Sequence, residues 1–201
     1  MALVSTILTR VALILNDAAY TRWTTAELES WFNDGVRETV NLHRNANEKN
    51  VVVALVAGVK QAMPADAVVL IDVVGNVNAD ATAGKKIRPC LRQQMDTNFP
   101  KWQSDSPSLV IDNLMYDISN RKVFYVYPPA LPGAKVELVH SFYPTAVTAT
   151  SEIPLDAIFH TPLVDYILFR AYSKDAEVAQ NAQLAASYLQ LFRTAVIPTK
   201  E

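Results

Sequence analysis

The sequence contains few of the residues on which enzymes and secreted proteins most often depend. Its 201 residues include five glycines, three histidines and one cysteine. Five glycines leave no loop of either common type that cradles a phosphate, because such loops need several glycines at fixed spacing. The single cysteine, Cys90, allows no disulfide within the chain. One unpaired thiol is what we expect of a protein that is assembled in a reducing cytosol.

The chain also lacks a strong excess of one charge and a long apolar run. Lysine and arginine number 18 and aspartate and glutamate 20, which gives a net charge of −2. Tight, nonspecific nucleic-acid binding needs many unopposed basic residues, so this balance argues against it. No apolar run approaches the roughly 20 residues of a membrane-spanning helix. Half of the residues are hydrophobic, which predicts a globular protein without a membrane partner.

Candidates for catalysis are few and scattered. The three histidines, His43, His140 and His160, fall in a predicted helix end, a strand and a loop, without the spacing of metal ligands. Cys90 would act as a nucleophile only if neighbouring basic residues lowered its pKa, and an inert thiol is the simpler interpretation. No pair of carboxylates is singled out by the sequence. We therefore predict no catalytic residues, no metal site and no cofactor.

Both ends of the chain show helical periodicity. Residues 4–15 carry apolar side chains at steps of three and four, which predicts an amphipathic helix. Thr24 and Glu27 form a capping box at the start of a second helix. Gly35 inside that helix costs about 1 kcal/mol relative to alanine, which favours close contact with another helix. Thr161-Pro162 is a start signal for a third helix.

A fourth helix is predicted after the polar run 173–175. One apolar row along it consists of Val178, Ala182, Ala185, Leu189, Phe192 and Val196. A second row beside it consists of Leu184, Tyr188, Leu191 and Ala195. Both rows follow the helical period, and we expect one of them to pack within the subunit.

The middle of the chain changes to short runs typical of β-strands. VVVALVA (51–57) is apolar on both faces, which predicts a covered strand. LMYDISNRKVFYVYPP (114–129) is the clearest hairpin, and its two prolines are expected to end the second strand. Further strands are predicted in 68–74, 85–91 and 135–144. The stretch 75–84 is rich in Gly, Asn, Asp and Ala, which predicts a flexible loop.

These patterns predict an α+β fold, with a helical bundle built from both chain ends and an antiparallel β layer between them in sequence. We expect a single domain over residues 1–201, with a helical part in 1–50 and 154–197 and a β part in 51–148. Parallel βαβ units are not expected, because no helical pattern separates the strands.

One basic cluster stands out directly after the predicted loop. It consists of Lys85, Lys86, Arg88 and Arg92, and it is the candidate site of contact with a partner. Such a cluster can present charge to a phosphate backbone or to an acidic protein surface. The alternative is a solvated strand edge that lysines protect from aggregation.

Five segments of the chain, in order, resemble a family of tailed-bacteriophage head-to-tail adaptor (connector) proteins. They are RWTTAELESWFNDG, KQAMPADAVVLIDVVGN, IRPCLRQQMDTNFPKW, DISNRKVFYVYPP and DYILFRAYSKDAEVAQNAQLAASYLQLF. The resemblance implies a non-enzymatic ring subunit of the virion, made in the host cytoplasm, that docks beneath a dodecameric portal protein. It also implies tail (nozzle or tube) proteins as partners and DNA that passes through the lumen without sequence specificity. A tail-tube or tail-completion subunit and a nucleic-acid-binding accessory protein remain alternatives.

Overall fold

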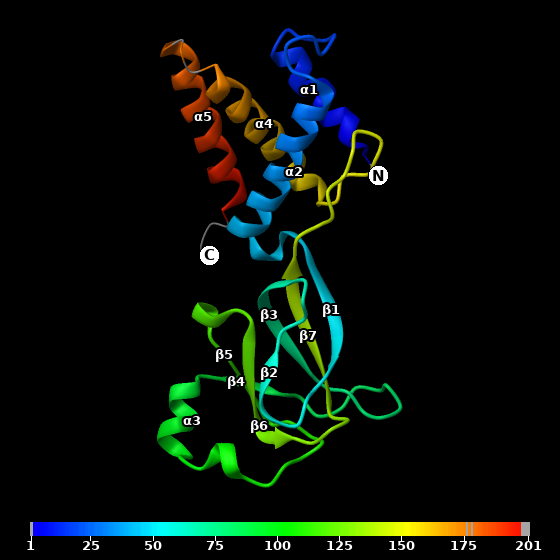
Figure 1. Cartoon of the computed structure of the whole chain (residues 1–201), viewed down its shortest axis with the longest axis vertical. Coiled ribbons are helices and arrows are strands. Elements are labelled where there is room, and N and C mark those ends of the chain that lie inside the picture. The colour runs from blue at the N-terminus through cyan, green and yellow to red at the C-terminus, as the bar shows by residue number, and fades with distance from the viewer. Residues whose placement is uncertain (1, 176, 178, 198–201) are drawn as a thin grey trace. The chain divides into compact units, whose positions relative to one another are not determined.

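The computed structural model describes residues 2–175, 177 and 179–197, and it divides the chain into two compact units. The helical unit comprises residues 1–47 and 143–201, and the β unit comprises residues 48–142. Along the sequence, four of the α-helices come from the two ends of the chain, and all the strands come from the residues between them (Figure 1). The predicted α+β class is confirmed. One adaptor domain over residues 1–201 stays a prediction.

The helical unit contains four α-helices in its described part: α1 (Val4–Ile14), α2 (Thr25–Leu42), α4 (His160–Lys174) and α5 (Ala179–Val196). Short 3-10 helices span Arg44–Ala46 and Ala157–Phe159. Helix α4 packs against α1, α2 and α5, so it lies at the centre of this unit. Its residues Leu163, Ile167 and Ala171 are fully buried. This explains why its sequence is apolar nearly all round.

The start of α2 follows the sequence signal in part. The Thr24 Oγ1 accepts a hydrogen bond from the Glu27 N–H at 3.3 Å. The Glu27 carboxylate, however, accepts from Lys174 Nζ at 2.6 Å. Its ion pair with α4 therefore replaces the second half of the capping box. Farther along α2, a Cβ added to Gly35 would lie 2.9 Å from Tyr166 Cδ1. The predicted close contact of Gly35 with another helix is confirmed.

Helix α5 packs along α4 through the first of its two predicted rows. Ala185, Phe192 and Val196 are buried and Leu189 is half-buried, whereas Ala182 is exposed. Val178 lies outside the described residues. In the second row Leu184 and Tyr188 are half-buried, and Leu191 and Ala195 are exposed. One row therefore packs within the subunit, and α5 leaves its other side open to solvent.

The β unit holds two sheets in its described residues. The seven strands are β1 (Glu48–Ala54), β2 (Gly58–Ala62), β3 (Ala67–Asn76), β4 (Arg88–Cys90), β5 (Asn113–Tyr116), β6 (Val123–Ala130) and β7 (Lys135–Phe142). One sheet has the order β1-β7-β3 and the other β2-β6-β5-β4. Neighbouring strands are antiparallel, except that β4 and β5 run parallel over three residues. Helix α3 (Arg92–Asn98) and 3-10 turns at Trp102–Ser104 and Ile118–Asn120 complete the unit.

Two local predictions in this unit were wrong, and one short helix was missed. β1 is not covered on both faces: it is an edge strand, and Val52 is 51% exposed. Pro128 and Pro129 do not end β6, because their carbonyls can still accept; the Pro129 oxygen accepts from the Ser108 N–H at 2.8 Å. Helix α3 was not predicted, since its single buried residue, Met95, gives no apolar period in so short a helix.

The burial of Phe192 against α4 should dominate the stability of α5. Its ring is fully buried and meets the Tyr166 ring edge to face at 5.0 Å between centroids. We expect Phe192→Ala to lower the free energy of unfolding by about 3–5 kcal/mol, measured by chemical denaturation. The adjacent Leu191 is 55% exposed, so Leu191→Ala is the matched control and should cost less than about 1 kcal/mol. Equal losses for both variants would contradict this packing.

Any side chain larger than that of glycine at position 35 should destabilise the protein, although alanine has a higher helix propensity than glycine. We expect Gly35→Ala to lower the free energy of unfolding by about 1–2 kcal/mol, because overpacking of about 1–3 kcal/mol outweighs a gain of about 1 kcal/mol in helix propensity. Ser30→Ala on the exposed side of α2 is the control and should be neutral or slightly stabilising. A stabilising Gly35→Ala variant would show that Tyr166 moves aside freely.

Candidate partner-binding site

The stretch between β3 and β4 forms an ordered hairpin. The Asn76 N–H donates to the Lys85 oxygen at 2.9 Å, and the Asn78 N–H donates to the Thr82 oxygen at 2.9 Å. At the tip, hydrogen bonds from the Thr82 hydroxyl and N–H hold the pKa of the Asp80 carboxyl below its usual value. The composition of 75–84 predicted a loop, but backbone pairing, which composition does not reveal, orders it.

The side chain of Asn76 fixes the base of this hairpin. Its Nδ2 donates to the Lys85 oxygen at 2.8 Å and to the Ile111 oxygen at 2.7 Å. Its Oδ1 accepts from the Ile111 N–H at 2.8 Å. The residue is 5% exposed, so a buried amide ties the hairpin to the segment that leads into β5. We call this point the fork.

At the fork the two arms of the hairpin separate. β3 pairs with β7 in one sheet, whereas β4 pairs with β5 in the other. Each is the last strand of its sheet, so each has an edge without a strand partner in the part of the chain that is described. Between them lies a cavity of about 410 Å³, which we call the seam. It is lined by residues 70–73 of β3, 89–91 in and after β4, Gln94, Leu114 and Tyr116.

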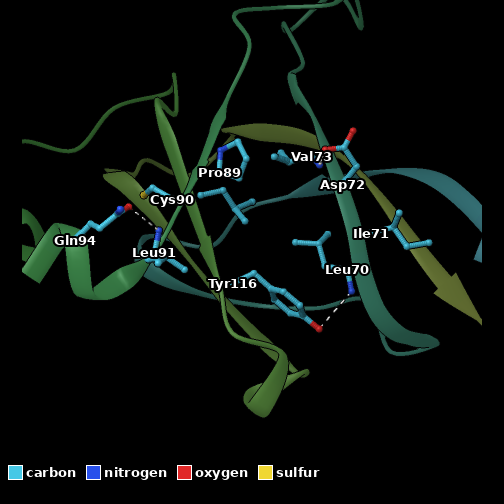
Figure 2. Close-up of a pocket in the computed structure, with 10 residues that line it drawn as sticks. Leu70, Ile71, Asp72, Val73, Pro89, Cys90, Leu91, Gln94 and Tyr116 are labelled. Atoms are coloured by element: carbon cyan, nitrogen blue, oxygen red, sulfur yellow. Dashed lines mark hydrogen bonds between the residues drawn. The ribbon is translucent and has the colours of Figure 1, made fainter. Parts of the chain in front are cut away.

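Side chains bond to backbone N–H groups along the seam. The Leu70 N–H donates to the Tyr116 hydroxyl at 3.3 Å, so the Tyr116 ring bridges the gap between the sheets (Figure 2). The Val73 N–H donates to the Asp72 carboxylate at 2.8 Å, and the Leu91 N–H donates to Gln94 Oε1 at 3.3 Å. These donors are therefore satisfied without a neighbouring strand.

The seam adjoins a second groove of about 560 Å³, which Tyr116 also lines. Both share Leu70, Leu91 and Tyr116, and the second adds Met115, Ile118 and Arg92 among its lining residues. Leu91 is 62% exposed at the boundary. Together the two form an apolar groove between β3 on one side and β4, α3 and β5 on the other.

The predicted basic cluster separates into two paired and two unpaired residues. Lys85 Nζ lies 2.6 Å from Asp112 Oδ1. Arg92 Nε lies 3.5 Å from Asp96 Oδ2, and the Arg92 guanidinium stands 5.0 Å from the centre of the Tyr125 ring. Lys86 and Arg88 are exposed and form no ion pair with any described carboxylate. Contact of the cluster with a partner stays a prediction.

The other candidate residues lie apart from one another. Cys90 is half-buried in the seam, and burial raises the pKa of its thiol, which disfavours the reactive thiolate at neutral pH. His43 Nδ1 donates to the Val196 oxygen at 3.0 Å in the helical unit, His140 is buried in β7, and His160 begins α4. Among the described residues, no group of three His, Cys, Asp or Glu side chains is placed to hold a metal ion.

The comparison with protein families matches this chain over nearly its whole length. The model of the SU10 adaptor protein family aligns with residues 2–198. The chain belongs to the SU10 adaptor protein family, a family of phage head-to-tail adaptors. The resemblance inferred from the five sequence segments is thereby confirmed. No curated protein matches the chain. No described helix of this adaptor is long and apolar enough to cross a bilayer.

Sequence reasoning identified the basic residues but missed the seam beside them. The seam consists of two strand edges, and an edge is defined by which strands pair, not by the residues of one strand. The available signal was the position of the predicted strand 85–91, which follows the predicted loop directly and ends in the exposed Leu91. That signal cannot be distinguished from an ordinary strand without knowledge of the sheet order.

The amide of Asn76 should hold the fork together. We expect Asn76→Ala to cost about 2–4 kcal/mol of unfolding free energy, because it leaves the buried Ile111 N–H and oxygen without partners. Hydrogen exchange of the amides in 77–86 should also accelerate. Asn78→Ala on the exposed part of the hairpin is the control and should cost less than about 1 kcal/mol. Unchanged exchange in Asn76→Ala would mean that the hairpin holds without the fork.

Proposed function

We propose that this phage structural adaptor forms a homo-oligomeric, dodecameric ring beneath the portal protein and links the portal to the tail (nozzle or tube) proteins of the virion. The observation that carries the proposal is the family match over residues 2–198. DNA passes through the lumen of the ring without sequence-specific contacts. A net charge of −2 supports this, because a mildly acidic subunit does not retain DNA by phosphate contacts.

Membership in a structural adaptor family supports a non-enzymatic role. The proposal therefore assigns no catalytic residue and no cofactor. What a ring subunit needs is one heterologous interface, in which two different surfaces of the same chain meet and repeat around an axis.

The helical unit offers two surfaces suited to such an interface. On α5, Leu191 and Ala195 lie four residues apart on one face and are both exposed, and the small side chain of Ala195 lets another helix approach closely. On α1, Leu13 and Ile14 are exposed near the end of the helix. Both helices pack on α4, and both keep apolar side chains in solvent. We propose that the α5 surface of one subunit meets the α1 surface of the next.

The test is to mix the purified chain with purified portal and to image the product by electron microscopy. An adaptor forms a ring on the portal. We expect Leu191→Glu to abolish that ring, since it places a charge in an apolar contact, while the variant keeps the wild-type unfolding transition. Ser30→Glu, which adds the same charge on exposed α2, should assemble normally.

Other results would support other functions. Polymerisation into tubes without portal would favour a tail-tube subunit. Salt-dependent DNA affinity of the free chain, without a ring on the portal, would favour a nucleic-acid-binding accessory protein. A normal ring from Leu191→Glu would place the interface elsewhere on the subunit.

A further inference from the structure

The seam has the properties of a binding site for an extended peptide. Strand edges without a partner bind extended segments readily, because their backbone groups repeat at the spacing of an added strand. Here two such edges, those of β3 and β4, lie on either side of one cavity. Figure 2 shows Leu70 and Tyr116 within this gap and Ile71 pointing away from it on the far side of β3. An inserted segment would thus meet N–H donors on β3, whereas Pro89 in the middle of β4 has no N–H and offers only its carbonyl oxygen.

The hydrogen bonds within the seam can be exchanged for those of a bound strand. The N–H groups of Leu70 and Val73 donate to the Tyr116 hydroxyl and the Asp72 carboxylate. Both acceptors belong to side chains, and the Tyr116 bond is long, at 3.3 Å. A backbone carbonyl of an added strand can replace either acceptor without leaving a buried donor unsatisfied.

The apolar lining accommodates alternate side chains of such a strand. The seam and the second groove have volumes of about 410 and 560 Å³, and they share Leu70, Leu91 and Tyr116. In an extended segment, every second side chain points to the same face. Apolar side chains at these positions would enter the two cavities, both of which Tyr116 lines, and cover the exposed Leu91.

The charges around the seam select the remaining side chains. Lys86 and Arg88 precede or lie in β4 and form no ion pair with a described carboxylate. Arg92 lines the second groove on the same side. The β3 side carries Asp72. Asp117 also lines the second groove. Carboxylates of a bound segment are therefore attracted to Lys86 and Arg88 at the start of β4 and repelled from Asp72 on β3, and this difference orients the segment.

We propose that the seam binds an extended segment of a partner protein in which apolar residues alternate with acidic ones. The segment adds a strand between β3 and β4, inserts its apolar side chains beside Leu70 and Tyr116, and pairs its carboxylates with Lys86 and Arg88. The inference rests on the proposed function in one respect: the partner is a portal or tail protein of the virion.

Cys90 provides a reporter in the unmodified chain, because it is the only cysteine and it lines the seam. The probe is a synthetic peptide of about eight residues, a typical strand length, in which valine alternates with glutamate. We expect this peptide to slow the labelling of Cys90 by a small thiol reagent and to protect the Leu70 and Val73 amides from hydrogen exchange. A peptide with lysine in place of glutamate should do neither at the same concentration.

Variants separate the charge contribution from the strand edge. The double variant Lys86→Ala, Arg88→Ala should weaken binding of the acidic peptide about fivefold to tenfold, with a smaller salt dependence. The control removes two other exposed lysines of the β unit, Lys60→Ala and Lys101→Ala, and should bind as the wild type does. Tyr116→Phe should bind more tightly, because the Leu70 N–H loses the hydroxyl that competes with the peptide.

Several results would overturn the proposal. One is that saturating acidic peptide leaves the labelling rate of Cys90 unchanged, and another is that the lysine peptide binds as tightly as the acidic one. A third is that self-association without peptide protects Cys90, which would make a second copy of the chain the occupant. A portal-bound ring whose assembly with tail proteins leaves Cys90 labelling unchanged would refute this inference and leave the proposed function intact. A chain that binds the acidic peptide but forms no ring on the portal would refute the proposed function instead.

Discussion

The hydrogen bonds of the buried Asn76 amide determine where one hairpin divides between two sheets. On one side of Asn76 the arms pair with each other, and on the other side each joins a different sheet. A buried amide is suited to this position because it donates to two carbonyls and accepts from one N–H at the same time. The edges of β3 and β4, the cavity between them and the position of the basic residues all depend on this branching.

The helical unit depends on a different constraint, the burial of α4 on several sides. Helices α1, α2 and α5 all pack on it, and Gly35 of α2 brings its backbone close to Tyr166. The ring of Tyr166 on α4 also contacts Phe192 of α5, so this one aromatic residue packs against both α2 and α5. Because α1 and α5 use only one face each to cover α4, their other faces remain available for contacts with further proteins.

The two units therefore differ in the kind of contact that they offer. The exposed faces of α1 and α5 carry small and apolar residues, which suit helix packing between copies of one rigid subunit. The β unit offers strand edges, an apolar groove and two unpaired basic residues, which suit an extended segment. An adaptor that forms a ring has to bind copies of itself and proteins of other kinds. Helix packing on one unit and strand addition on the other would keep these two sets of contacts distinct.

The sequence by itself determined the α+β class, the helices at both ends and the hairpin of β5 and β6. These features follow from local periodicity, which each segment carries within its own residues. It also determined the family, since five segments in order carried the resemblance. Gly35 was a correct local sign of a tertiary contact, because a helical glycine has a cost that only close packing offsets.

Only the tertiary structure decided the features that depend on which segments pair. Composition predicted a loop at 75–84, but pairing across Asn76 and Lys85 made it a hairpin. The apolar run 51–57 could not reveal that β1 ends a sheet and exposes Val52. Likewise, the basic cluster was visible in the sequence, but Asp112 and Asp96 decide which of its charges are already paired. Such properties come from residues distant in sequence, so no local pattern contains them.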